Sequence, residues 1–196
     1  FKPTLGRISR HGVFPVSWSL DTMGCFTRTV EDVAILLQPQ AGRDPKDQTS
    51  SYRRVPDYWG ALKSLNNPRI GVVNNPFVKM ADPEVQQLTD MAIQKFIQAG
   101  AIVEEIRITT DLDMLINAHG IIMAVEAASV HQDKFKHHRG DYGAKITRLL
   151  DKGISTRGVD YADALRSVER FKQDMRKAIN GFDALLTPTT TSPAPR

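Results

Sequence analysis

One segment of the sequence constrains the fold most, because it reads as a strand, a helix and a second strand in close succession. Arg69-Ile70-Gly71-Val72-Val73 is a short apolar run of the kind that forms a buried strand. Asp82 and Pro83 give the start signals of a helix, and Gly100 follows where that helix would end. Ala101 to Ile106 is a second strand-like run. A strand–helix–strand unit of this length predicts two parallel strands joined by a right-handed crossover.

Further elements complete an α/β pattern around this unit. Ala184-Leu185-Leu186, stopped by Pro188, predicts a third strand in the same sheet. Apolar residues at helical spacing predict three more helices. These run from Thr110, the expected N-cap of the first, to Gly140, from Asp141 to Leu150 with a stop at Gly153, and from Asp160 to Gly181. We therefore expect a mixed β-sheet flanked by helices. The strands lack a Gly-x-Gly-x-x-Gly turn, which disfavours a dinucleotide-binding fold.

The part of the chain before the sheet contains a predicted helix that begins after Thr29, a good N-cap residue. Pro39 disfavours helical backbone at Gln38, so this helix is expected to stop near there. A short helix is expected around Trp59 and Leu62.

The chain also carries several short motifs in a distinctive order. It reads Lys2-Pro3-Thr4-Leu5-Gly6-Arg7-Ile8-Ser9, then Gly12-Val13-Phe14-Pro15, then Ser19-Leu20-Asp21-Thr22-Met23-Gly24, then Arg28-Thr29-Val30-Glu31-Asp32, and near its end Asp183-Ala184-Leu185-Leu186-Thr187-Pro188-Thr189. In this order the motifs resemble those of the amidase signature family, and the resemblance spans the whole chain. Cys25 departs from the family pattern, which has proline at that position.

The resemblance implies hydrolysis of a carbon–nitrogen bond. In that family a lysine deprotonates a bridging serine, which activates a nucleophilic serine, and water releases the acyl-enzyme. These catalytic residues precede the Lys2-Pro3-Thr4 run in the family pattern. We therefore expect the chain to be the C-terminal part of a single amidase domain, inactive alone, with no catalytic residue of its own. Residues 1–67 would be an arm and first helix, and residues 68–196 the strand–helix–strand unit with the long helices.

By the same resemblance, two elements of this chain would line a substrate pocket. One is the middle of the long helix, around Ile121, Ile122 and Val125. The other is the segment Thr187-Pro188-Thr189 after the last strand. Ligands of open α/β sheets bind at the carboxyl ends of the strands, which favours the second element independently. For the three helix residues, plain core packing is the stronger alternative.

Other catalytic or metal-binding arrangements find little support in the sequence. No Gly-x-Ser-x-Gly elbow is present. His131 and His138 share a helix face, but a rise of 1.5 Å per residue separates them by about 10.5 Å, too far for one zinc ion. Cys25, the only cysteine, has no indicated base beside it, so we interpret it as a small packed side chain. We expect neither a metal nor a cofactor.

Charge and hydropathy limit the partners. The net charge is +4, but basic and acidic residues are interleaved, which is typical of solvated helix faces rather than a nucleic-acid site. No uninterrupted apolar run approaches the roughly 20 residues of a membrane helix. A single cysteine mildly favours a reducing, cytoplasmic location. The expected partners are a small-molecule amide and the N-terminal half of the amidase domain, with homo-oligomers left open.

Three interpretations of function remain. The run from Asp141 to Ala164 resembles free-standing bacterial amidases more than the amidotransferase subunit that serves transfer-RNA charging. A linear-amide hydrolase is therefore favoured over a protein of that amidotransferase type and over a non-catalytic binding module on the same scaffold. We also expect residues 1–28 to expose apolar surface, and to be disordered, swapped or packed on another copy, because the family's neighbouring strands are not in this chain.

Overall fold

The computed structural model describes the chain except for residues 64–65, 75–77, 79, 109 and 195–196. The residues group into two compact units. Unit 1 comprises Phe1–Leu65 and Ile121–Arg157, and unit 2 comprises Asn66–Gly120 and Gly158–Arg196. The first division between the units falls close to residue 67, where the segment of arm and first helix was expected to end. Residues 121–157 group with that segment rather than with the strand–helix–strand unit.

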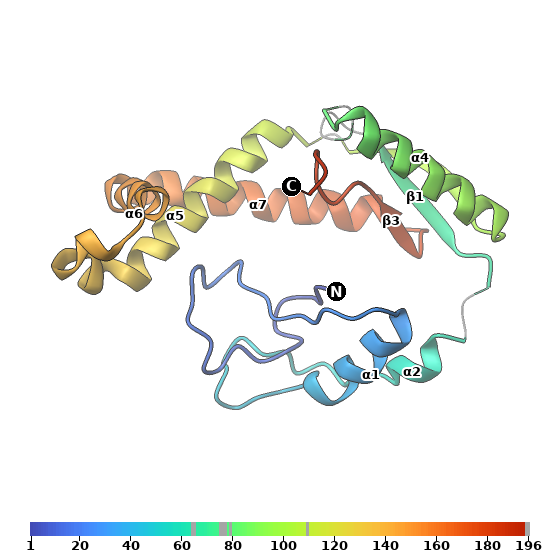
Figure 1. The fold of residues 1–196 in the computed structure, drawn as a ribbon, viewed down its shortest axis with the longest axis horizontal. Helices are drawn as coiled ribbons and strands as arrows, with labels where there is room; N and C mark the ends of the chain where they lie inside the picture. The colour runs from blue at the N-terminus through green and yellow to red at the C-terminus, as the bar shows by residue number, and fades with distance from the viewer. Residues whose placement is uncertain (64–65, 75–77, 79, 109, 195–196) are drawn as a thin grey trace. The chain divides into compact units, whose positions relative to one another are not determined.

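Unit 2 contains a sheet of three parallel strands (Figure 1). β1 (Arg69–Asn74) lies between β2 (Ile102–Arg107) and β3 (Ala184–Leu186). Ile70 of β1 is paired with Val103 on one side and with Ala184 on the other. The α/β class and the placement of all three strands in one sheet are therefore confirmed. A mixed sheet was expected, but both pairings among these three strands are parallel. Helices connect the strands and return the chain to the end of the sheet where each strand begins.

Helix α4 (Pro83–Gln98) connects β1 to β2 and runs beside the sheet (Figure 1). Its limits match the prediction, with Asp82 at the N-cap and Pro83 at the first helical position. The Asp82 carboxylate makes no capping hydrogen bond, but its backbone N–H donates to the Thr191 carbonyl at 2.7 Å. Gly100, just past the helix, has φ of +90°, a conformation that glycine adopts without a Cβ clash.

The apolar face of α4 is not covered in this structure. None of the described residues of α4 is buried. Leu88 is 57% exposed, and Phe96 and Ile97 are also exposed. Unit 2 therefore leaves an apolar helix surface open to solvent.

Helix α5 (Leu112–His137) is the long helix that was predicted between Thr110 and Gly140. Its N-terminal cap is Asp111, whose Oδ1 accepts a hydrogen bond from the Met114 N–H at 3.1 Å. Thr110 was expected to be the cap. Its hydroxyl donates instead to Asp174 of α7 (Gly158–Ala178) at 2.8 Å, which leaves the adjacent carboxylate to satisfy the helix end.

By length and composition α5 could cross a membrane, although the sequence contains no long uninterrupted apolar run. The core helix of a soluble protein meets the same criterion. Glu126, in the middle of α5, is buried and accepts hydrogen bonds from Ser17 and Ser19 of the same unit. This part of the helix therefore packs against protein.

Helix α6 (Ala144–Ser155) is longer than predicted, because Gly153 lies inside it instead of ending it. Gly153 is buried against α5. A Cβ atom at this position would clash with the carbonyl oxygen of Ala124 and with the Cβ of Ala128. The glycine therefore serves a close approach of two helices, which the sequence alone could not distinguish from a helix stop.

Helices α5 and α6 enclose a small core in unit 1. Ala127, Phe135 and Leu150 are buried together there. The ring of Tyr142 packs edge-on against Phe135, with 5.2 Å between the centroids. Tyr142 also bonds through its hydroxyl to Nδ1 of His131 at 3.0 Å.

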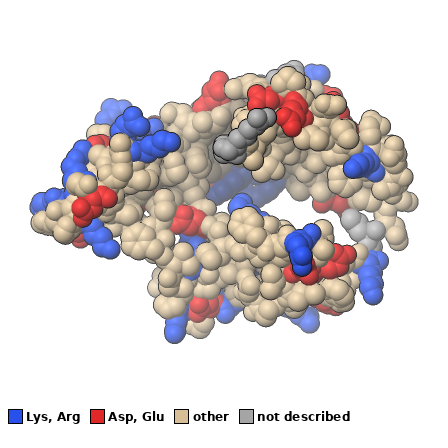
Figure 2. Space-filling model, in the orientation of Figure 1, with Lys and Arg blue, Asp and Glu red and all other residues tan. Residues whose placement is uncertain are grey.

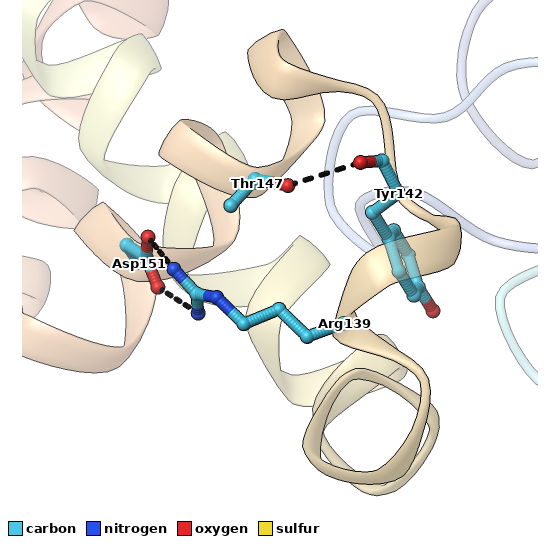
Figure 3. A network of polar contacts seen from close by, with 4 residues as sticks. All are labelled: Arg139, Tyr142, Thr147 and Asp151. Atoms are coloured by element: carbon cyan, nitrogen blue, oxygen red, sulfur yellow. Dashed lines mark hydrogen bonds and ion pairs between the residues drawn. The ribbon is translucent and has the colours of Figure 1, made fainter.

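An ion pair and a hydrogen bond span the turn between α5 and α6 (Figure 3). Arg139, in the 3₁₀ turn η1 (Arg139–Asp141), donates to both carboxylate oxygens of Asp151 at 2.7 and 2.6 Å. Hydrogen bonding from Arg139 holds the pKa of Asp151 below its ordinary value. Thr147 Oγ1 donates to the Tyr142 carbonyl at 3.3 Å. The turn is thus fixed by polar contacts at the solvent surface.

The last helix, α7, begins at Gly158, slightly before the predicted start at Asp160. Gly181 follows it with φ of +87° and turns the chain toward β3. Asp183, just before that strand, accepts a hydrogen bond from the Arg69 N–H at the start of β1. These contacts confirm the predicted helix–turn–strand order at the end of unit 2.

Helix α1 (Val30–Gln40) begins as predicted, with Thr29 accepting a hydrogen bond from the Asp32 N–H at 3.1 Å. It ends at Gln40, two residues beyond Gln38, with Pro39 inside its last turn. Pro39 has no N–H to donate to the carbonyl four residues earlier, so the helix lacks one backbone hydrogen bond there. The short helix α2 (Tyr58–Ala61) is the one predicted near Trp59.

That the arm, residues 1–28, is disordered, swapped or packed on another copy stays a prediction. In this structure it makes hydrogen bonds with other segments of its own chain. Arg7, for example, donates to the Tyr58 hydroxyl at 2.7 Å and to the carbonyls of Arg53 and Arg54. The expected exposure of apolar surface is confirmed. Its exposed large side chains are Phe1, Leu5, Val13, Phe14, Val16, Trp18 and Phe26.

Candidate functional site

The residues predicted to contact substrate fall in both units. On α5, Ile121 and Val125 are half-buried, whereas Ile122 is only 1% exposed and is a core side chain as it stands. After β3, Thr187 and Thr189 are exposed on either side of the buried Pro188. The first set belongs to unit 1 and the second to unit 2. Substrate contact by these residues stays a prediction.

Unit 1 contains a cavity that the sequence did not predict. Its volume is about 630 Å³, within the range of small-molecule sites. Two loop segments that are distant in sequence form it. The lining residues are Arg10 to Val16, Trp18, Asp21 to Met23, and Lys46 to Thr49.

The floor of the cavity is held by an arginine and an aspartate. The Asp47 carboxylate accepts hydrogen bonds from the Arg10 N–H at 2.8 Å and from the Thr49 hydroxyl and N–H. The hydrogen bond from the Thr49 side chain, followed by that from Arg10, lowers the pKa of Asp47 from 3.8 to about 2. This carboxylate therefore stays ionised near neutral pH and ties the two loop segments together.

Arg10 completes the link with its side chain. Its guanidinium donates to the carbonyls of Trp18 and Asp21 and to the Thr49 hydroxyl, and the side chain is only 8% exposed. Its Nε atom is buried and has no hydrogen-bond partner among the described residues. The guanidinium thus positions the strip of chain that carries Trp18.

Asp21, the carboxylate inside the third sequence motif, braces a tight turn. Its Oδ2 accepts hydrogen bonds from the N–H groups of Val16 and Ser17 at 2.8 and 3.0 Å.

Ser17 and Glu126 form a buried pair that resembles a nucleophile beside a base. Ser17 Oγ donates to Glu126 Oε2 at 2.5 Å, and the same carboxylate accepts from the Ser19 N–H and hydroxyl. Ser17 is only 1% exposed, so a substrate could not reach its oxygen. We therefore assign this pair to positioning of the loop and not to nucleophilic catalysis.

The other candidate reactive residues are engaged or dispersed. Cys25 is a free, half-buried thiol. His131 bonds to Tyr142, and His138 lies 3.7 Å from the carboxylate of Asp141. Within the described ranges, no group of three or more His, Cys, Asp or Glu side chains is arranged to hold a metal ion.

Charge is mixed on the face of the molecule shown in Figure 2. Over the end of α5 and over α6, at the left of the view, basic side chains alternate with acidic ones. The pair of Arg139 with Asp151 is one such contact. This pattern matches the interleaved charges expected from the sequence.

Comparison with known proteins defines the class of this chain. The family model described as Amidase matches residues 1–196, and the chain belongs to that family. A glutamyl-tRNA(Gln) amidotransferase subunit of Pseudomonas fluorescens is 35% identical over 98% of this chain and 45% of its own length. An amidase of Pseudomonas putida is 34% identical over 100% of this chain and 42% of its own. The chain thus spans less than half the length of these curated relatives.

The solved structures agree with this fold. One described as the crystal structure of an amidase is 27% identical, with a TM-score of 0.81 over 99% of this chain and 41% of that one. Another, from a vestigial protein complex tied to the origins of an s-triazine catabolic enzyme, is 26% identical with a TM-score of 0.85, covering 96% of this chain and 41% of that one. The α/β fold of this chain is therefore that of the amidase family.

Proposed function

We propose that this chain is part of an amidase that hydrolyses the carbon–nitrogen bond of a small linear amide through an acyl-enzyme. The observation that carries the proposal is the match of the amidase family model to residues 1–196. The ordered motifs of the arm, and the Thr187-Pro188-Thr189 segment after β3, support it.

The nucleophile, in this proposal, lies on a part of the amidase domain outside residues 1–196. The family resemblance puts the nucleophilic serine, its bridging serine and the lysine ahead of the Lys2-Pro3-Thr4 run. This chain then supplies scaffold and part of the substrate pocket, and its principal partner is the N-terminal half of the domain. The proposed substrate contacts are two separate sets, Ile121, Ile122 and Val125 on α5, and Thr187, Pro188 and Thr189 after β3.

Two alternative functions remain. The relatives include an amidotransferase subunit as well as an amidase. The amidotransferase relative and the amidase relative differ by one per cent in identity, 35% against 34%. A role like that of the amidotransferase relative is thus the nearest alternative, and a non-catalytic binding module the next. We prefer the free-standing amidase for the motif pattern between Asp141 and Ala164. A cytoplasmic location is proposed from the single cysteine.

An amide-hydrolysis assay tests the proposal. Residues 1–196 would be compared with a longer protein that adds the residues preceding Phe1 in the same reading frame, using a panel of linear amides. We expect ammonia release from the longer protein and none above background from residues 1–196. A longer protein that binds amides without turnover would support the binding module. Turnover by residues 1–196 that disappears in the Cys25→Ala variant would contradict the proposal.

A further inference from the structure

The cavity of unit 1 has one wall of large apolar side chains. Val13, Phe14, Val16 and Trp18 line it, and each is between 42% and 59% exposed. Two of the four are aromatic. Side chains of this size gain free energy when a ligand covers them, and aromatic faces favour a flat apolar partner.

Both aromatic rings make contacts with charged or aromatic side chains that restrict their movement. The Phe14 ring lies edge-to-face with His131 at 5.3 Å, and Lys134 Nζ is 5.1 Å from its centroid. The Arg10 guanidinium lies 5.9 Å from the centroid of Trp18 and donates to its carbonyl. Binding usually costs free energy because side chains at the site become ordered. Rings that are already restrained add little to this cost.

The charges around the cavity disfavour an ionised ligand. Asp21 and Asp47 line it. Asp44 lies beside the same loop, where hydrogen bonds from the Ser9 hydroxyl and the Lys46 N–H lower the pKa of its carboxyl, with smaller contributions from the charges of His11 and Lys46. These three carboxylates offset Arg10 and Lys46, so an added anion meets no excess of positive charge. For a cation, Asp47 offers little, because its carboxylate already accepts three hydrogen bonds, and Asp21 accepts two at its Oδ2.

Some polar side chains of the lining have hydrogen-bond donors that no other group of the described chain uses. The side chains of His11 and Lys46 line the cavity and are exposed. Across the described part of the chain, neither side chain makes a hydrogen bond or a close ion pair. A ligand that presents a carbonyl oxygen would give such donors a partner, which is the usual role of the few polar groups in an apolar site.

We propose that this cavity binds a small, uncharged aromatic amide, with the ring between Phe14 and Trp18 and the carbonyl oxygen toward Lys46 and His11. The inference rests on the proposed function only insofar as the bound amide would be a substrate. Binding itself needs no nucleophile, so it can be measured separately from hydrolysis.

Intrinsic fluorescence gives a direct test, because the chain has two tryptophans and only Trp18 lines the cavity. In a Trp59→Phe background, Trp18 is the sole reporter. We expect benzamide to change its emission saturably, with a dissociation constant on the order of 1 mM. Acetamide, which lacks the ring, and benzoate, which carries a charge, are each expected to bind at least about threefold more weakly.

A matched pair of variants locates the ligand. Phe14→Leu keeps an apolar side chain but removes the ring, and should weaken benzamide binding at least about threefold. Phe26→Leu makes the same change at a fully exposed position outside the cavity and should leave binding unchanged. Equal binding of acetamide, tighter binding of benzoate, an unsaturable response, or unchanged affinity in Phe14→Leu would each overturn the inference. If the longer protein binds benzamide but does not hydrolyse it, the proposed function is contradicted and the inferred binding site is not.

Discussion

Asp47 is the residue through which the two loop segments of the candidate site depend on each other. It lies on the second segment and accepts hydrogen bonds from Arg10 on the first and from Thr49 on its own. Its side chain is only 8% exposed, so these bonds are shielded from water. The sequence marks it as a loop aspartate and gives no sign of the partner that comes from Arg10.

Removing the Asp47 carboxylate should change how stability depends on pH. Its pKa falls from 3.8 to about 2 on folding, so the unfolded chain binds more protons between these values. Its contribution is therefore complete above about pH 4 to 5 and is lost as the pH falls toward 2. We expect Asp47→Asn to be less stable than the parent at pH 7 and to lose less stability between pH 4 and 2.

Urea unfolding at a series of pH values measures this effect. Asp90→Asn, which removes an exposed carboxylate of α4, is the control and should keep the parent's pH profile. An Asp47→Asn profile parallel to that of the parent throughout would show that the carboxylate has no such role.

Gly153 allows a second test at the residue scale. A side chain there would meet the backbone of Ala124 and the side chain of Ala128, so Gly153→Ala should destabilise unit 1 by about 1–3 kcal/mol. Gly158→Ala is the matched control, since no atom lies within 4 Å of its added Cβ, and its effect should stay within about 1 kcal/mol. Denaturant melts of the two variants that coincide would contradict the close helix approach.

At the scale of elements, one buried carboxylate of α5 makes hydrogen bonds to the arm. Glu126 is 7% exposed and accepts hydrogen bonds from Ser17 and Ser19, the residues on either side of Trp18. A helix residue thereby sets the course of the loop that forms the apolar wall of the cavity.

Glu126→Ala should leave the donors of Ser17 and Ser19 without their acceptor. The expected loss is about 1–3 kcal/mol for each buried group left unpaired, and Glu126→Gln, which keeps one acceptor oxygen, should lose less. In the Trp59→Phe background, the emission of Trp18 should shift more in Glu126→Ala than in Glu126→Gln. Glu169→Ala, at an exposed ion pair of α7, should change stability by no more than about 0.5 kcal/mol. Equal stability of Glu126→Ala and Glu169→Ala would refute this role.

Elements were predictable where the signal was local. The apolar runs at Ile70 and Ile102 and the start signals at Asp82 and Pro83 gave strands and a helix at their observed positions. The sequence-based predictions failed where a residue distant in sequence determines the local structure. Thr110 loses its cap role to Asp111 because Asp174 takes its hydroxyl. The cavity was missed for the same reason, since it forms only when Arg10 and Asp47 meet.

The whole molecule carries the amidase family fold in two units with much apolar surface open. The exposed side chains of the arm and of α4, such as Phe26 and Leu88, are the clearest cases. Relatives more than twice as long share the fold, and in our proposal the rest of an amidase domain covers part of this surface and brings the nucleophile. The proposal that this chain is one part of an amidase domain therefore depends on where the reactive serine lies.

The position of that serine can be measured directly with a serine-reactive fluorophosphonate probe followed by peptide mass spectrometry. The probe would be applied to residues 1–196 and to the longer protein. We predict an adduct on a serine that precedes Phe1 in the longer protein, and none on any serine within residues 1–196 in either sample. Stoichiometric modification of a serine inside this chain, such as Ser9, Ser17 or Ser19, would contradict the proposed position of the nucleophile.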